Sequence, residues 1–179
     1  MDNIISAAEL RRQIQEHRLA VEKRPGIYRW WFPQKESDRL ISRFSSKSVA
    51  AKMRLQTKII QGVVFSGLYF GISSDMSRRI RWHILGPFKS STLRRTLWAV
   101  VAPDADENTA ETIINKLIDS CFWEWEYTET VEQAECRETE ELAQQKIAYP
   151  LNISKNKTMP SEWIAELKLF RANVKRKRK

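Results

Sequence analysis

The stretch 63–83 most constrains the fold, because its patterning changes from strand-like to helix-like within a few residues. Its first part is apolar and rich in β-forming side chains, which predicts a strand over residues 63–72. A helix is expected over residues 75–85, since Ser74 or Asp75 can accept hydrogen bonds from its first free N–H groups. The sequence therefore predicts a buried strand that turns directly into a helix.

Three polar side chains of this stretch are expected to meet where the strand passes into the helix. Tyr69 lies in the strand, while Arg79 and His83 are four residues apart and share one helix face. A phenol, a guanidinium and an imidazole brought together can hold a phosphate group. Taken alone, Arg79 would more often be a surface cation, so this pattern needs support from elsewhere in the chain.

That support comes from a second short apolar strand, predicted over residues 26–32. It contains Gly26-Ile27-Tyr28, and the later strand contains Tyr69-Phe70-Gly71. With Arg79 and His83 at their distances beyond Tyr69, the pattern resembles the GIY-YIG nuclease family. The resemblance covers roughly residues 25–160.

The C-terminal part agrees with the resemblance, and two features depart from it. An acidic helix over residues 131–148 precedes Tyr149-Pro150-Leu151-Asn152-Ile153, which is similar to the family's catalytic glutamate followed by a Pro-x-Asn segment. Phe70 stands where the family usually has isoleucine, and residues 34–61 form a long interruption between the two strands. Restriction-type members resemble this chain in carrying insertions at that place.

The resemblance implies an α/β (α+β) fold with a small three-stranded antiparallel sheet flanked by several helices. The third strand is predicted over residues 122–127, where aromatic residues alternate with glutamates. A length of 179 residues suits a single domain over residues 1–179. An N-terminal helix is expected over residues 4–23, with Ser6 as its cap, and a basic tail over residues 171–179.

The interruption over residues 34–61 carries seven cations and two carboxylates, a net charge of +5. It is poor in glycine and proline, so much of it is expected to be helical. Spaced cations could neutralise DNA phosphates, although a solvated helix hairpin is the alternative. The candidate nucleic-acid-binding residues are Arg39, Arg43, Lys47, Lys52, Arg54 and Lys58, with Arg94 and Arg95 in a later helix as further candidates or as merely solvated cations.

Composition points in the same direction. A net charge of +9 and a pI near 9.7 favour a polyanionic partner, nucleic acid before membrane. Two cysteines are too few for a disulfide framework, and with two histidines they show no zinc spacing. We expect no signal peptide and no membrane span, so a cytoplasmic protein is predicted.

The resemblance also implies roles for the site residues. Tyr28 would take a proton from the attacking water, aided by Tyr69 or His83, provided that nearby cations lower its pKa from the usual value of about 10. Arg79 would pair with the scissile phosphate. Asn152 would brace the site or hydrogen-bond to the substrate.

A glutamate of the acidic helix would hold one Mg²⁺ or Mn²⁺. Glu140 and Glu138 both stand at suitable separations from Asn152. Cys136, Ala143 and Ile147 predict the inward face of the helix, and Glu140 falls on it, so Glu140 is the first choice and Glu138 the second.

The predicted function is therefore a divalent-metal-dependent endonuclease that hydrolyses double-stranded DNA, with a restriction-type enzyme as one form and a homodimer as one means of cutting both strands. Two alternatives stay open. One is a nucleic-acid-binding module without catalysis, and the other is a structure-specific nuclease acting on branched DNA or RNA. The sequence does not decide the recognition site.

Overall fold

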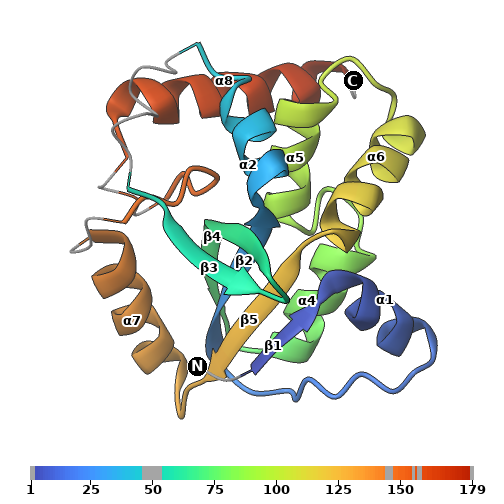
Figure 1. Cartoon of the computed structure of the whole chain (residues 1–179), viewed down its shortest axis with the longest axis vertical. Coiled ribbons are helices and arrows are strands. Elements are labelled where there is room, and N and C mark those ends of the chain that lie inside the picture. Colours follow the sequence, from blue (N-terminus) through green and yellow to red (C-terminus); the bar gives the residue numbers. More distant parts are fainter. Residues whose placement is uncertain (1–2, 46–53, 144–146, 155, 157–158, 178–179) are drawn as a thin grey trace.

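The computed structural model describes residues 3–45, 54–143, 147–154, 156 and 159–177. Strands and helices alternate irregularly along this part of the chain (Figure 1). The strands are β1 (Asn3–Ser6), β2 (Gly26–Pro33), β3 (Gln56–Ile60), β4 (Val63–Ser73) and β5 (Phe122–Tyr127). The helices are α1 (Ala7–Gln15), α2 (Gln34–Ile41), α4 (Met76–Ile84), α5 (Thr92–Val101), α6 (Glu107–Asp119), α7 (Val131–Ala143) and α8 (Ser161–Lys177).

The strands form one antiparallel sheet in the order β1-β5-β2-β4-β3. Its centre, β5-β2-β4, is the predicted three-stranded sheet, and the mixed α/β class is confirmed. The predicted number of strands was wrong, because one further strand is added at each edge.

Both additional strands arise where a helix was expected. Residues 3–6 pair with β5, so the N-terminal helix begins only after Ser6, whose side chain accepts a hydrogen bond from Glu9 N at 3.2 Å. At the other edge, β3 joins β4 through Gln61 and Gly62, which both have positive φ angles, 53° and 78°. Such a two-residue turn matches the twist of a hairpin, so the interruption supplies a strand as well as the helix α2.

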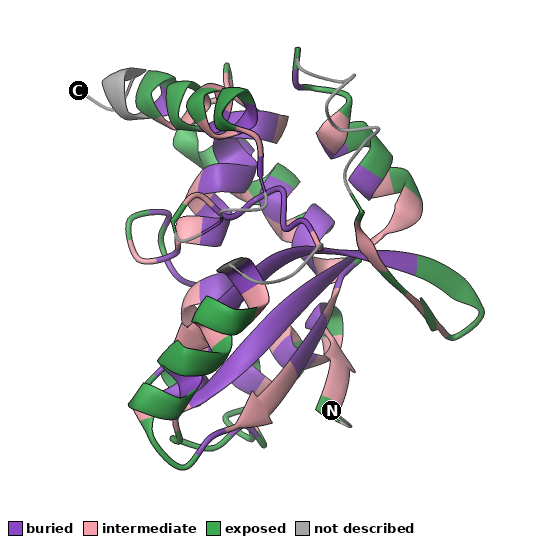
Figure 2. Ribbon diagram, turned by 90° about the vertical axis from the view of Figure 1, so that its left-hand side faces the viewer, coloured by how far each residue is buried: buried purple, intermediate pink, exposed green. Residues whose placement is uncertain are grey.

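Helices cover the two faces of the sheet unequally (Figures 1 and 2). On one face, Tyr28, Trp30 and Phe32 of β2 belong to a large apolar core with α1, α4, α5 and α6. On the other face, Ile27 and Phe70 pack in a small cluster with α7. None of the helices in the described segments is long and apolar enough to cross a membrane.

The edge of β4 is finished by a loop instead of a strand. β3 pairs with β4 only as far as Gly67. Beyond it, Leu151 N donates to Leu68 O at 3.0 Å, and the Asn152 side chain bonds both backbone groups of Phe70, at 2.9 Å to N and 2.7 Å to O. The Pro-Leu-Asn segment therefore satisfies backbone groups that a further strand would otherwise have paired.

Replacing Asn152 by leucine should lower the free energy of unfolding by about 2 to 6 kcal/mol, because it leaves two backbone groups of Phe70 unpaired and each such buried group costs about 1 to 3 kcal/mol. Equilibrium unfolding in urea measures this loss. Asn173→Leu is the matched control, since Asn173 is exposed on α8. Equal stabilities of the two variants would contradict the bracing role of Asn152.

Candidate active site

Two tyrosines from neighbouring strands lie side by side on the large-core face of the sheet. Tyr28 pairs in register with Gly71, and the rings of Tyr28 and Tyr69 have centroids 6.3 Å apart. A Cβ atom on Gly71 would lie 2.5 Å from the Tyr28 hydroxyl oxygen. Glycine is required here because the Tyr28 ring packs directly on the backbone of β4.

His83 reaches Tyr28 from α4. Asp75 caps this helix by accepting a hydrogen bond from Arg78 N at 2.8 Å, which confirms one of the two expected caps. The imidazole is fully buried, with Nε2 at 2.9 Å from the Tyr28 hydroxyl and Nδ1 at 2.7 Å from Ser91 Oγ. Ser91, the N-cap of α5, is a supporting residue that the sequence analysis did not single out.

Burial keeps this tyrosine–histidine pair neutral. Burial raises the pKa of Tyr28 well above its usual value, and the neighbouring Tyr69 phenol adds to the shift. Burial, with Arg79 and Arg94 nearby, holds the pKa of His83 well below its usual value. The condition set for Tyr28 as a base, a pKa lowered by nearby cations, is not met: Arg79 acts to lower the pKa of Tyr28, but the effect of burial is larger.

The two tyrosines open onto a cavity of about 260 Å³ at the edge of β4. Arg79 and Asn152 line it, and so does Glu138 of α7. The cavity therefore gathers two phenols, a guanidinium and a carboxylate from four separate parts of the chain. Its full lining is Tyr28, Tyr69, Phe70, Gly71, Ile72, Arg79, Thr92, Glu138, Asn152, Ile153, Ser154 and Arg171.

The helical phase predicted for the acidic helix was wrong. Ala134 and Leu142 are the buried residues of α7, and Glu138 lies midway between them on the same face, half-buried. Glu140 is exposed and accepts a weak hydrogen bond from the equally exposed Cys136, at 3.8 Å, beside a different cavity. The first choice, Glu140, thus lies outside the cavity and the second choice, Glu138, lies in it.

A buried charge network holds α7 against the sheet. Arg29, on the opposite face of β2 from Tyr28, pairs with Glu141 at 3.1 Å and donates to the Tyr149 hydroxyl at 3.1 Å. The same guanidinium lies 3.9 Å from Glu124, to which Trp31 Nε1 donates at 2.9 Å. Arg29 was not among the predicted site residues, although one cation inside an apolar strand is a signal for a buried partner.

The profile of the GIY-YIG catalytic domain matches residues 26–173. The chain belongs to the GIY-YIG family. Comparison with curated proteins and with solved structures gives no significant match. In this GIY-YIG chain the two signature triplets, 26–28 and 69–71, are adjacent strand segments of one sheet.

Membership gives the coarse function of the chain. GIY-YIG domains are phosphodiester nucleases, and nucleases of this family generally use divalent metal ions. Asn152 lines the cavity, but both polar atoms of its side chain are bonded to Phe70. Of its two expected roles, the structure therefore favours bracing.

The basic residues proposed to bind DNA have different surroundings in this GIY-YIG chain. Arg43 and Arg54 are exposed, and Arg39 is exposed beside Glu36 at 3.5 Å. Lys58 forms an ion pair with the buried Glu124, so it belongs to the network that holds α7. Lys47 and Lys52 lie outside the described residues.

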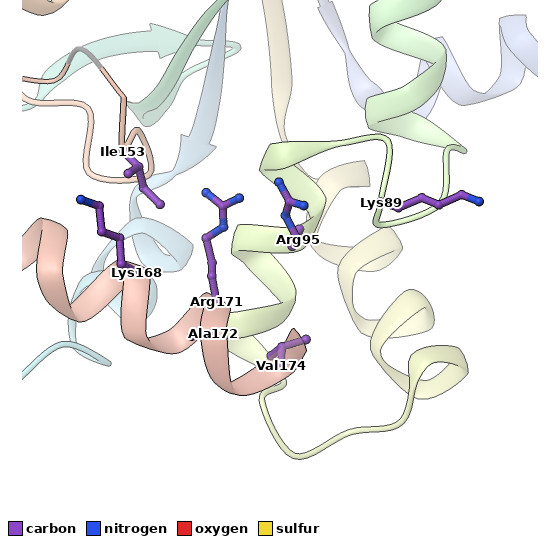
Figure 3. Close-up of a pocket in the computed structure, with 7 residues that line it drawn as sticks. All are labelled: Lys89, Arg95, Ile153, Lys168, Arg171, Ala172 and Val174. Carbon is purple, nitrogen blue, oxygen red and sulfur yellow. The ribbon is translucent and has the colours of Figure 1, made fainter. Parts of the chain in front are cut away.

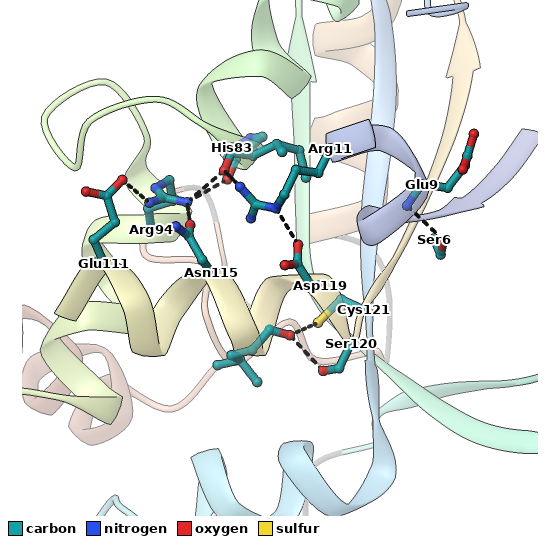
Figure 4. A network of polar contacts seen from close by, with 12 residues as sticks. Ser6, Glu9, Arg11, His83, Arg94, Glu111, Asn115, Asp119, Ser120 and Cys121 are labelled. Carbon is teal, nitrogen blue, oxygen red and sulfur yellow. Dashed lines mark hydrogen bonds and ion pairs between the residues drawn. The ribbon is translucent and has the colours of Figure 1, made fainter. Parts of the chain in front are cut away.

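Arg94 and Arg95 are neighbours in sequence but have opposite environments. Arg95 lines a second cavity between α5 and α8 (Figure 3). Arg94 is fully buried, and its guanidinium donates to the carbonyl oxygens of His83 and Ile84 and to Asn115 (Figure 4). The prediction that Arg94 binds nucleic acid was wrong, because its charge stabilises the C-terminal end of α4.

The free energy of unfolding should fall as the pH drops below 6.5, the usual pKa of histidine. Unfolded His83 takes up a proton there and the folded, buried imidazole does not, so protonation favours the unfolded state by up to about 1.4 kcal/mol per pH unit. Urea unfolding between about pH 7.5 and 5.5 measures the slope.

The same titration of His83→Gln should give a shallower slope in this pH range. His17→Asn is the control, because His17 is exposed and asparagine tolerates its positive φ of 56°. An unchanged slope in His83→Gln would show that another group causes the pH dependence.

Proposed function

We propose that this chain is a divalent-metal-dependent endonuclease that hydrolyses phosphodiester bonds of double-stranded DNA. The observation that carries the proposal is the cavity shared by Tyr28, Tyr69, Arg79 and Glu138. These groups provide what the reaction needs: a proton acceptor, a cation for the phosphate and a metal ligand.

Arg79 is suited to bind the scissile phosphate. It is half-buried in the cavity wall, and its guanidinium centre lies 5.5 Å from the Trp82 ring, which limits its movement. Its buried Nε has no hydrogen-bond partner among the described residues. A phosphate oxygen would satisfy such donors and gain two parallel hydrogen bonds from the guanidinium fork.

Tyr28 would act through His83. Its hydroxyl donates to Nε2 when Nδ1–H of the imidazole donates to Ser91, and the lone pairs of the Tyr28 oxygen are then left to accept a proton from water. Because Tyr28 is held neutral, it can take that proton only by passing its own to His83. This relay assigns the imidazole a direct part in the reaction.

Glu138 would be the protein ligand of the metal ion. In the described segments, no group of three or more histidine, cysteine, aspartate or glutamate side chains is placed to hold a metal. A single half-buried carboxylate suits Mg²⁺ or Mn²⁺, which keep several waters and share substrate oxygens. When bound, such an ion would neutralise negative charge developing on the leaving oxygen.

Nicking of supercoiled plasmid with Mg²⁺ tests the site. Glu138→Gln and Arg79→Ala should each lower the nicking rate on the order of a hundredfold or more, because each removes a charge that stabilises the transition state. EDTA should abolish nicking by the unaltered protein.

Each variant has a matched control in the same helix. Glu140→Gln removes the same negative charge as Glu138→Gln, but at a residue outside the cavity. Arg78→Ala removes an exposed guanidinium that packs on the same Trp82 ring as Arg79. Both controls should nick at the normal rate. If Glu140→Gln were inactive and Glu138→Gln active, our choice of metal ligand would be wrong.

Substrate class separates this proposal from its alternatives. A restriction-type enzyme would cut linear duplex DNA at fixed positions, whereas a structure-specific nuclease would require branched DNA or RNA. A non-catalytic binding module would bind these substrates and cut none of them with Mg²⁺ or Mn²⁺.

A further inference from the structure

The second cavity, which we call the basic cavity, has a volume of about 500 Å³. Four cations line it: Lys89, Arg95, Lys168 and Arg171. None of the described residues of its lining is acidic. In Figure 3 the guanidinium groups of Arg95 and Arg171 lie side by side, with Lys168 next to Arg171.

Two residues connect the basic cavity with the active-site cavity. Arg171 and Ile153 line both. Arg171 thus lies on the boundary between the two cavities, close enough to Tyr69 and to Arg95 for both to influence its pKa. A chain molecule bound in the active site could continue past Arg171 into the basic cavity.

Among the residues that the structure describes, no ion pair neutralises the four cations of the basic cavity. Arg95 Nε is buried and has no hydrogen-bond partner in the described part of the chain. Burial lowers the pKa of Arg171, and the positive charge of Arg95 lowers it further. Two neighbouring guanidinium groups that repel each other in a partly buried site would be stabilised by an anion between them.

The remaining lining is apolar and suits a nucleotide better than a free ion. Ile153, Ala172 and Val174 form this part of the wall. A lone phosphate ion would leave most of the volume unfilled, whereas the sugar attached to a phosphate in a strand could lie against the apolar wall.

We propose that the basic cavity binds a phosphate group of the substrate strand next to the scissile phosphate, with Arg95, Arg171 and Lys168 as its contacts. The inference rests on the proposed function, because it takes the active-site cavity as the place of the scissile phosphate. It adds a second contact point that would fix the direction in which the strand crosses the site.

Binding of a short fluorescein-labelled DNA duplex in EDTA tests the proposal without requiring cleavage. Arg95→Gln and Lys168→Gln should each weaken the affinity about three- to tenfold, the effect of losing one charged phosphate contact. Over about 50 to 200 mM NaCl, each should also reduce the slope of log K against log salt by about 0.9.

The matched controls are Arg12→Gln and Lys116→Gln, which remove exposed cations from α1 and α6. They should leave the affinity and the slope unchanged. Arg171 is left intact because it lines the active-site cavity too. Thermal unfolding of each variant verifies that it is folded, and Arg95→Lys, which removes the guanidinium fork, replaces Arg95→Gln if that variant does not fold.

Equal losses of DNA affinity in the cavity variants and the control variants would show a general charge effect and overturn the proposal. Unchanged DNA affinity in the cavity variants would overturn it too. Titration with inorganic phosphate distinguishes the source of the ligand. If calorimetry detects phosphate binding that Arg95→Gln abolishes, while DNA affinity is unchanged by that substitution, the cavity serves a free anion and the strand contact is wrong. If the unaltered protein does not nick DNA, but Arg95→Gln still weakens DNA binding as expected, only the proposed function is contradicted.

Discussion

The unpaired edge of β4 is the constraint on which the site depends. β3 pairs with β4 only as far as Gly67, and beyond that point Leu151 and the Asn152 side chain form the hydrogen bonds to the β4 backbone. A sixth strand at this edge would have separated α7 from the tyrosines, which lie on the other face of the sheet. Because Asn152 satisfies the backbone compactly, Glu138 can reach around the edge into the same cavity as Tyr28 and Tyr69.

Burial and charge act against each other within the cavity. Cations surround the site, yet burial dominates and keeps both Tyr28 and His83 in their neutral forms. An isolated phenolate is therefore not the resting proton acceptor of this protein. The hydrogen bond between Tyr28 and His83 is the contact through which the proposed relay would pass the phenol proton to the imidazole, and Ser91 holds the other ring nitrogen in place.

Local patterns predicted the elements well, because strand β4, the Asp75 cap and helix α4 depend on neighbouring residues. For the same reason, the spacing of Tyr69, Arg79 and His83 along β4 and α4 was enough to predict that they lie close together. The edge strands could not be predicted, since their pairing depends on β4 and β5, which are distant in sequence.

Two predicted side-chain placements at the site were wrong for one physical reason. The choice of Glu140 relied on Cys136 as an inward residue, yet Ala134 and Leu142 face the sheet, and an alanine gives little apolar signal. Arg94 and Arg95 are equally basic in sequence, and only the position of the end of α4 decides which one is buried. In both cases the burial of the side chain is set by the element that packs against it, and not by the residue type.

The unequal covering of the sheet has a consequence for how the protein responds to heat. Helix α7 rests on a small apolar cluster and on ion pairs, among them Arg29–Glu141 and Arg137–Glu126, while the tyrosines and Arg79 belong to elements anchored in the large core. Segments with little buried apolar area open first. On warming, Glu138 would leave the cavity before the sheet melts, so the metal binding proposed for Glu138 would be the first property lost and would return when α7 docks again on cooling.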